Sequence, residues 1–204
     1  MTMANLAVVV LAGGEGRRMG GSKPRMPWEE TTLIGHALDL ARRYGGDVAV
    51  AVRQEAQVAG AVEAHLLLDE PGIEGPLAGL ASALGFAQGL GAACVLTLPC
   101  DAPQLPADLA SRLQAALAPR FGVAVAQSCG RAHPTCALWR VGVLDALPGY
   151  TATGRRSLNG FATAVGMAEA AWPVVGPDPF ANANTPAELA ALQPRAGARY
   201  QAAD

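Results

Sequence analysis

A short apolar run near the start of the chain limits the possible architectures more than any other segment. Residues Leu6 to Leu11 read LAVVVL and stop at a cluster of glycines. A continuous β-branched run of this length, without polar alternation, is typical of a strand that is covered on both faces. We therefore expect this run to be the first strand of a parallel sheet.

Strand-like and helix-like segments alternate after this run. Apolar residues at helical spacing from Leu33 to Tyr44 stop at Gly45 and Gly46, and Asp47 to Val52 then reads as a strand. The same order continues, with helices expected at Gln54 to Ala64, Leu77 to Gln88 and Ala107 to Leu117, and strands at His65 to Leu68, Ala93 to Leu98 and Gly122 to Gln127. Such a series indicates an α/β sheet with right-handed crossovers.

The second half of the chain is less regular. Between Arg131 and Pro179 we expect strands at Pro134 to Leu138 and at Ala168 to Val174. A final helix is expected to begin at Pro186, with Thr185 as its cap. With 204 residues, 51% of them hydrophobic, the chain can bury a core as one globular domain.

Charge and composition exclude several classes of partner. The formal net charge of −2 gives no basic field, so neither a nucleic acid nor an anionic membrane surface is expected as a partner. The first apolar stretch is too short for a signal peptide or a membrane span, which makes the cytoplasm the default compartment. Cys94, Cys100, Cys129 and Cys136 form no CxxC pair and no metal-ligand cluster, so we expect reduced packing residues.

The glycine-rich loop after the first strand is a candidate phosphate site. Residues Leu11 to Lys23 read LAGGEGRRMGGSK. Glycines allow close approach of backbone N–H groups to a ligand, and Arg18 and Lys23 would add positive charge suited to a triphosphate. A P-loop is excluded because Ser22 stands between Gly21 and the lysine, and a dinucleotide fingerprint lacks its third glycine. A solvated turn remains the alternative.

Two carboxylates follow apolar strand runs. In an open α/β sheet ligands bind beyond the carboxyl ends of the strands. Asp69 follows one such run and could accept hydrogen bonds from a base or ribose, although alone it could also be a turn residue. Asp101, in the sequence LPCDAP, is the best candidate ligand for Mg²⁺, which prefers one or two carboxylates plus phosphate oxygens. A helix cap is the alternative for Asp101.

Three further polar clusters lie in the C-terminal half. They are RAHPT at Arg131 to Thr135, GRRS at Gly154 to Ser157 and FANANTP at Phe180 to Pro186. Taken alone, the asparagines of the last cluster would read as turn residues.

Together these motifs resemble the molybdenum cofactor guanylyltransferases. In that family LAGG is followed by Arg-Met-Gly and a lysine, and GPLAG, CD-x-P, HPT and F-x-N-x-NTP follow in order. Here GPLAG stands at Gly75 to Gly79, and the resemblance extends from about Leu6 to Leu192. It implies a Rossmann-like three-layer nucleotidyltransferase fold with a mostly parallel sheet in a single domain. Residues 1–110 would form a GTP-binding half, 111–192 an acceptor-binding half, and 193–204 a tail.

The resemblance also implies roles for individual residues. Arg18, Lys23 and Asp101 would be catalytic, with Asp101 binding Mg²⁺. The expected nucleotide contacts are Leu11, Ala12, Gly13, Gly14, Lys23, Asp69, Gly75, Pro76 and Asp101. The expected acceptor contacts are His133, Arg156, Asn182 and Asn184. His133 is expected to form structural hydrogen bonds and not to act as a general base, because a phosphate nucleophile is already ionised near neutral pH.

The implied reaction is an in-line attack by the terminal phosphate of molybdopterin on the α-phosphorus of GTP, with pyrophosphate leaving and with Mg²⁺ as cofactor. Related enzymes work beside other cofactor-assembly proteins and molybdoenzyme chaperones. The chain departs from the family at Ser22, where aspartate is usual, and at Ala51 to Arg53, where several relatives have asparagine. Arg53 or Gln54 could supply the second contact.

Two other functions are compatible with parts of this pattern. The first is a cytidylyltransferase or sugar-phosphate nucleotidyltransferase of the same fold, which the glycine loop alone would not distinguish. The second is a non-catalytic binding protein, which the replacements at Ser22 and Ala51 would favour and the presence of Lys23 and Asp101 disfavours.

Overall fold

A computed structural model describes residues 6–14, 23–60 and 63–193 of the chain. Its centre is a seven-stranded sheet with the order β5-β4-β1-β6-β8-β7-β9. The strands are β1 Leu6–Leu11, β4 Asp47–Val52, β5 His65–Leu68, β6 Cys94–Pro99, β7 Val123–Ser128, β8 Arg131–Arg140 and β9 Met167–Trp172. Each pair of neighbours is parallel except for the two pairs that include β8. The expectation of a mostly parallel sheet is confirmed.

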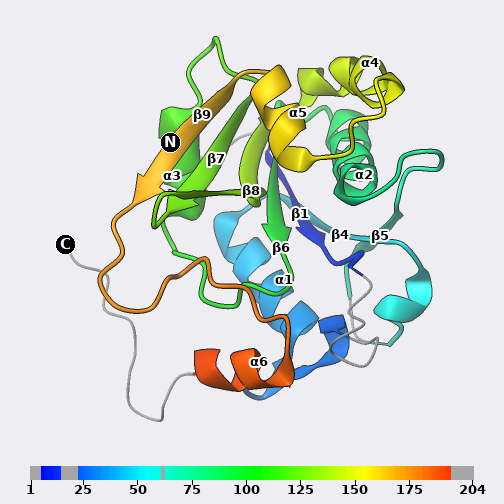
Figure 1. Cartoon of the computed structure of the whole chain (residues 1–204). Helices are drawn as coiled ribbons and strands as arrows, with labels where there is room; N and C mark the ends of the chain where they lie inside the picture. The colour runs from blue at the N-terminus through cyan, green and yellow to red at the C-terminus, as the bar shows by residue number, and fades with distance from the viewer. Residues whose placement is uncertain (1–5, 15–22, 61–62, 194–204) are drawn as a thin grey trace.

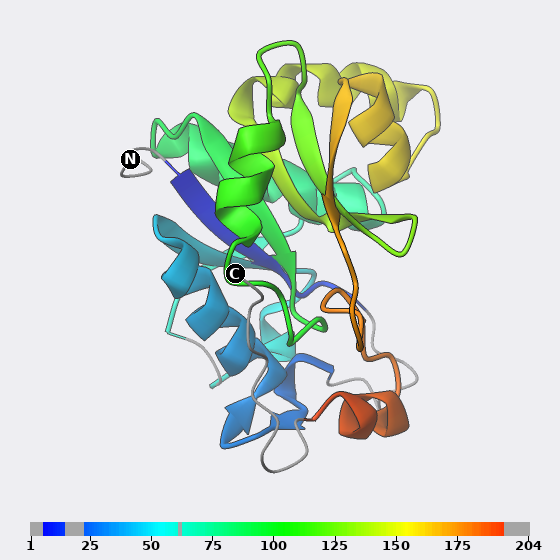
Figure 2. The same ribbon diagram turned by 90° about the vertical axis from the view of Figure 1, so that its left-hand side faces the viewer.

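Helices cover both faces of this sheet, as Figures 1 and 2 show. The helices are α1 Leu33–Tyr44, α2 Pro76–Gly89, α3 Leu109–Ala116, α4 Leu147–Ala152, α5 Leu158–Ala164 and α6 Pro186–Leu192. Helices α1 and α3 pack on one face, whereas α2, α4 and α5 pack on the other together with the 3-10 segment η4 Val141–Ala146. The result is a three-layer α/β structure.

Strand β1 shows why the first apolar run is continuous. Val8 and Val10 contribute to the core on the α1 side, and Ala7 and Val9 contribute to the core on the α2 side. All four side chains are fully buried. Burial on both faces removes the need for a polar residue at alternate positions, which is the pattern from which the strand was predicted.

The segment after β4 is not the expected helix from Gln54 to Ala64. The structure has a single 3-10 turn there, η3 Glu55–Gln57. The side chain of Gln57 accepts hydrogen bonds from the backbone N–H groups of Arg53 and Gln54, which caps the short turn. Gly60 then adopts a φ of 72°, which a continuing right-handed helix cannot accommodate.

The region from 131 to 179 contains more regular structure than we expected. Strand β8 runs antiparallel to both β6 and β7 and extends the expected strand in both directions. A two-residue turn joins β7 to β8, with φ values of 48° at Cys129 and 71° at Gly130. Positive φ at both central residues is characteristic of the type I′ hairpin turn. Helices α4 and α5 were not predicted.

The last helix lies away from the sheet, at the bottom of Figure 1. Its N-cap Thr185 accepts a hydrogen bond from the backbone N–H of Glu188, as predicted. Leu189 of this helix packs against Trp28 and Leu33. Trp28 belongs to a small hairpin formed by β2 Pro27–Trp28 and β3 Thr31–Thr32, which follows the 3-10 turn η2 Lys23–Arg25. This arrangement brings the C-terminal part of the chain next to the segment that carries Lys23.

Candidate functional site

A cavity of about 960 Å³ lies at the carboxyl ends of β1, β4, β5 and β6. Most of its walls come from four segments: the end of β1, the loop from β5 into α2, the residues after β6, and the stretch before α6. The nucleotide contacts that we predicted line it together, namely Leu11, Ala12, Gly13, Gly14, Lys23, Asp69, Gly75, Pro76 and Asp101. Asn182 and Asn184 also line it. Arg18 lies outside the described residues.

Three polar side chains from distant segments meet in this cavity. The ammonium of Lys23 forms an ion pair with Asp101 and donates a second hydrogen bond to Asn184 Oδ1, at 2.9 Å. The side chains of Lys23 and Asp101 are only 11% and 17% exposed. A carboxylate oxygen and an amide oxygen therefore contact one cation at a mostly buried position, where electrostatic attraction is stronger than in bulk water.

The segment that carries the asparagines is also tied to the main chain beside Asp101. The backbone N–H of Ala183 donates to the carbonyl oxygen of Asp101, at 2.9 Å. In Figure 1 the orange segment after β9 passes the carboxyl end of β6 on its way to α6. The last part of the chain thus completes a cavity that the first half begins.

Asp69 directly follows β5 and lies between Gly13 and Gly79. An added Cβ at Gly13 would lie 3.2 Å from Asp69 Oδ2, and one at Gly79 would lie 3.4 Å from Asp69 Oδ1. Oδ1 is buried and accepts no hydrogen bond within the part of the chain that the structure describes. Burial raises the pKa of this carboxyl, against the lowering effect of Arg53. A buried acceptor without a donor is costly in the free protein and is suited to a ligand N–H or O–H group.

Helix α2 begins at the same cavity. Gly75 precedes the helix with a φ of 73°, Pro76 occupies its first turn, and no side chain caps its N-terminus. The positive φ explains why glycine is needed at this point of the GPLAG motif. Unsatisfied N–H groups and the helix dipole make such an end favourable for an electronegative ligand group.

Two of the expected acceptor residues lie outside the main cavity. His133 lines a second cavity of about 320 Å³, which shares Asn182 and Asn184 with the first. Arg156 pairs with Glu74 at 2.5 Å, and both side chains are more than 60% exposed. Because Glu74 directly precedes Gly75 and lines the main cavity, Arg156 lies beside the N-terminus of α2. Its role toward an acceptor stays a prediction.

Several lining residues were not predicted from the sequence. They include Pro24, Ile73, Glu74, Cys100 and Thr135. Thr135 belongs to the HPT motif and could have been predicted from it. Ile73 and Glu74 lie in a turn whose sequence does not indicate ligand binding. Arg53, one of the two residues expected to replace the missing asparagine, does line the cavity.

The cysteines are all free thiols. Cys100 and Cys136 are buried, as expected of packing residues, whereas Cys129 is exposed in the hairpin turn. Burial raises the pKa of Cys100 to about 12, so this thiol beside Asp101 stays protonated near neutral pH. Among the residues that the structure describes, no group of three or more His, Cys, Asp or Glu side chains could hold a metal. Within the same ranges, no helix combines the length and apolar character that a membrane span requires.

The sequence matches a known family over most of its length. Residues 8–170 match the MobA-like NTP transferase domain. The chain is 40% identical to a molybdenum cofactor guanylyltransferase of Rhodobacter capsulatus over 195 residues, which cover 93% of this chain and 96% of that protein. It is 37% identical to one of Cereibacter sphaeroides over 191 residues, which cover 89% and 92% of the two chains.

Solved structures of nucleotidyltransferases share the fold. Molybdopterin-guanine dinucleotide biosynthesis protein A from Archaeoglobus fulgidus superposes with a TM-score of 0.71 at 21% identity, covering 91% of this chain and 95% of that one. A CMP:2-keto-3-deoxy-manno-octonic acid synthetase complexed with CTP gives 0.70 at 16% identity, covering 93% and 97%. A Mycobacterium tuberculosis protein in complex with manganese gives 0.60 at 20% identity, covering 84% and 90%.

Proposed function

Because this chain belongs to the molybdenum cofactor guanylyltransferases, within the MobA-like NTP transferase family, we propose that it transfers GMP from GTP to molybdopterin or the molybdenum cofactor. The products are the guanine dinucleotide form of the cofactor and pyrophosphate. One observation carries the assignment to this site: Lys23, Asp101 and Asn184 converge in the same cavity as the glycine loop and Asp69. Phosphate, base and acceptor functions are therefore available within one cleft.

The cavity divides naturally into a nucleotide side and an acceptor side. We assign GTP to the part formed by the end of β1, Asp69 and the start of α2, all of which belong to residues 1–110. We assign the acceptor to the part formed by Asn182 and Asn184, which belong to residues 111–192. Lys23 and Asp101 lie where the two parts meet, because Lys23 bonds to both Asp101 and Asn184.

Asp69 is the group best suited to read the guanine base or its ribose. Its Oδ1 atom is buried and receives no hydrogen bond from the residues that the structure describes, and guanine offers N–H donors that cytosine does not present in the same pattern. A site that leaves a buried acceptor unpaired discriminates against ligands that lack the matching donor. The fold alone does not select the base, since a synthetase whose structure was solved in complex with CTP has the same fold.

Mg²⁺ fits the residues at Lys23 and Asp101. The Asp101 carboxylate and the Asn184 amide oxygen already face one cation, the Lys23 ammonium, and both are hard oxygen donors. One carboxylate with few other protein ligands is the usual arrangement where substrate phosphates complete the coordination shell. When bound, the metal would neutralise charge that develops on the phosphate oxygens.

The protein's own groups would perform the remaining work. Lys23 would neutralise the triphosphate, and the loop amides after β1 would hold it in place, with Arg18 as a further expected contact. Asn182 and Asn184 would orient the acceptor phosphate for in-line attack, so that a new phosphoanhydride (P–O–P) bond to the α-phosphorus of GTP forms as the bond from that phosphorus to the leaving pyrophosphate breaks. No side chain must remove a proton, because the attacking phosphate is already ionised. We expect the enzyme to act in the cytoplasm, beside other cofactor-assembly proteins and molybdoenzyme chaperones.

The test is turnover with each of the four nucleoside triphosphates in turn, with Mg²⁺ present and with molybdopterin, molybdenum cofactor or a sugar 1-phosphate as acceptor. Pyrophosphate release and nucleotide incorporation are both measured. We expect turnover with GTP alone and only when the pterin is present. Turnover with CTP would refute the guanine assignment at Asp69, and turnover only with a sugar 1-phosphate would refute the pterin acceptor.

A further inference from the structure

The segment between β9 and α6 carries both asparagines of the cavity and has no regular secondary structure of its own. Asn184 accepts a hydrogen bond from Lys23, and the neighbouring Ala183 bonds to the backbone of Asp101. A loop that must present side chains with sub-ångström accuracy needs fixed anchors elsewhere. The contacts at the start of this segment are therefore of functional interest.

Asp178 is the strongest of these anchors. Its Oδ1 atom accepts a hydrogen bond from the backbone N–H of Phe180 at 2.9 Å, which closes a tight turn. Its Oδ2 atom accepts a second hydrogen bond, at 2.9 Å, from the hydroxyl of Ser128 at the end of β7. The same carboxylate thus shapes the segment and ties it to a buried residue of the sheet.

The hydrogen-bond chain continues to the imidazole of His133. Ser128 Oγ lies 2.7 Å from His133 Nε2. The hydroxyl has one proton, which it donates to Asp178, so it must accept from Nε2–H of the ring. His133 in its neutral form therefore carries its proton on Nε2 and a lone pair on Nδ1. Burial lowers the pKa of His133, against the attraction of Asp178, and Arg131 lowers it further, so the neutral form is favoured.

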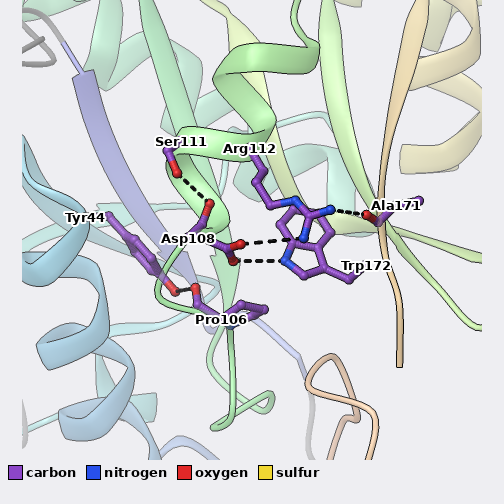
Figure 3. Close-up of polar contacts among 7 residues, drawn as sticks. All are labelled: Tyr44, Pro106, Asp108, Ser111, Arg112, Ala171 and Trp172. Carbon is purple, nitrogen blue, oxygen red and sulfur yellow. Dashed lines mark hydrogen bonds and ion pairs between the residues drawn. The ribbon is translucent and has the colours of Figure 1, made fainter. Parts of the chain in front are cut away.

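Aromatic packing supports the turn from behind. Phe180 stacks on His133 with ring centroids 4.9 Å apart. It also packs against Trp172 in a T-shaped arrangement, with ring centroids 5.1 Å apart. Figure 3 shows how Trp172 is held: its indole N–H donates to Asp108, and Arg112 lies over its ring while bonding to Asp108 and to Ala171. The turn from Asp178 to Phe180 is thus held by the packing of Phe180 against Trp172 and by the hydrogen bond from Ser128 to Asp178.

We propose that Asp178 is a positioning residue for acceptor recognition, which places Asn182 and Asn184 at the cleft and fixes the imidazole of His133 in the second cavity. The inference rests on the proposed function, since it concerns the acceptor side of that site. It is supported by the second cavity, which Asp178 and His133 line and which shares both asparagines with the main one. Asp178 acts through its neighbours and not on the reacting atoms.

Steady-state kinetics provide the first test. Asp178→Ala should raise the KM for the pterin acceptor roughly tenfold or more, because a charged acceptor of two hydrogen bonds is lost. The Kd for GTP should change by less than about twofold, because the nucleotide side is untouched. Asp178→Asn keeps an oxygen for the Phe180 N–H group and should restore most of the acceptor affinity. Asp39→Ala, which removes an exposed aspartate paired with Arg42 on α1, is the matched control.

Long-range ¹H–¹⁵N correlation spectra of the histidine rings provide the second test. The chain has three histidines, so a His133→Gln variant assigns the signals. We expect the Nε2–H form of His133 in the wild type and a shift away from that single form in Asp178→Ala.

An unchanged acceptor KM together with an unchanged tautomer would overturn the proposal. The proposal would also be overturned if Asp178→Ala and Asp178→Asn both lost affinity for GTP and for the acceptor to the same extent and had a lower Tm. Such a result would show that Asp178 stabilises the fold and does not position the acceptor residues. A wild type that is inactive with the pterin would count against the proposed function, and the tautomer would then decide the inference alone.

Discussion

The ammonium of Lys23 is paired with the carboxylate of Asp101, 78 residues away along the chain, and bridges it to Asn184. Lys23 is the only lysine in the sequence, whereas there are 14 arginines. A lysine presents a compact point charge, whereas the guanidinium of arginine is a planar fork, so the two would not be equivalent beside the proposed metal ligand and triphosphate. The pair lies between the part of the cleft to which we assign GTP and the part to which we assign the acceptor.

Asp101→Ala should lower turnover by roughly two orders of magnitude or more, because removal of the carboxylate removes the proposed metal ligand. The fold should stay intact, since the side chain lies at the wall of an open cavity. Turnover and thermal unfolding of the variant are compared with those of Asp39→Ala, whose carboxylate is 56% exposed. Wild-type activity in Asp101→Ala would remove this residue as the metal ligand.

Lys23→Ala should weaken GTP binding roughly tenfold or more, since a charge-assisted contact to the triphosphate is lost. Lys23→Arg should lose less affinity for GTP than Lys23→Ala, because it keeps the charge but not the shape. Calorimetric titration with GTP measures both effects. As an independent check, GTP should protect the single lysine from acylation, with the N-terminal amine as internal reference. Normal GTP affinity in Lys23→Ala would refute the assignment.

Gly13→Ala should reduce GTP affinity roughly tenfold, because the new methyl group would press on Asp69 and on the side chain of Arg53, 3.2 and 3.3 Å away. The matched control is Gly85→Ala on α2, where an added Cβ meets nothing within 4 Å. The control should keep wild-type affinity and gain slight stability, because alanine favours the helix. Equal affinity in the two variants would show that Gly13 and Asp69 need no close approach.

Asp69→Asn should stabilise the ligand-free protein at neutral pH while weakening GTP binding. Partial burial raises the folded-state pKa of Asp69, so ionisation of this half-buried carboxyl opposes folding, and the cost grows as the pH rises from the unfolded-state pKa to the folded-state pKa. The asparagine does not ionise, and its Tm should exceed that of the wild type by about 2 °C or more at neutral pH.

The sign of this effect can be checked by lowering the pH. Below the unfolded-state pKa of Asp69 the wild-type carboxyl is neutral in both the folded and the unfolded protein, so this contribution to the difference in Tm should disappear. Thermal unfolding of both proteins from acidic to neutral pH measures it. A difference that grows as the pH falls would contradict the raised pKa.

Much of the nucleotide side could be predicted from the sequence. The run at Leu6–Leu11 and the residues after it are local signals, because an apolar strand followed by glycines places the loop at the ligand-binding edge of the sheet. Asp69 and Asp101 were found by the same reasoning. Their chemistry also suggested a base or ribose at Asp69 and Mg²⁺ at Asp101, whereas GTP and the pterin acceptor came from the resemblance.

The acceptor side was harder to predict because its contacts are long-range. The apolar pattern of β8 indicates a strand but not its direction, so the antiparallel pairing with β6 and β7 was not foreseen. The partner of Asp178 is Ser128, 50 residues earlier, and nothing in the local sequence links them. The helix expected at Gln54 to Ala64 is reduced to a single turn, because Gly60 adopts a positive φ that a continuing right-handed helix cannot accommodate.

The contact between Lys23 and Asn184 joins residues that are 161 positions apart. A ribosome makes the glycine-rich segment and Asp101 first and reaches Asn184 only 83 residues after Asp101. At typical rates of synthesis this interval lasts on the order of 4 to 16 seconds. During that time a nascent chain can assemble the parallel half of its sheet but not the acceptor wall. If Asn184 acts as we propose, we expect a partly made chain not to consume GTP on a pterin until the segment that carries Asn184 has emerged.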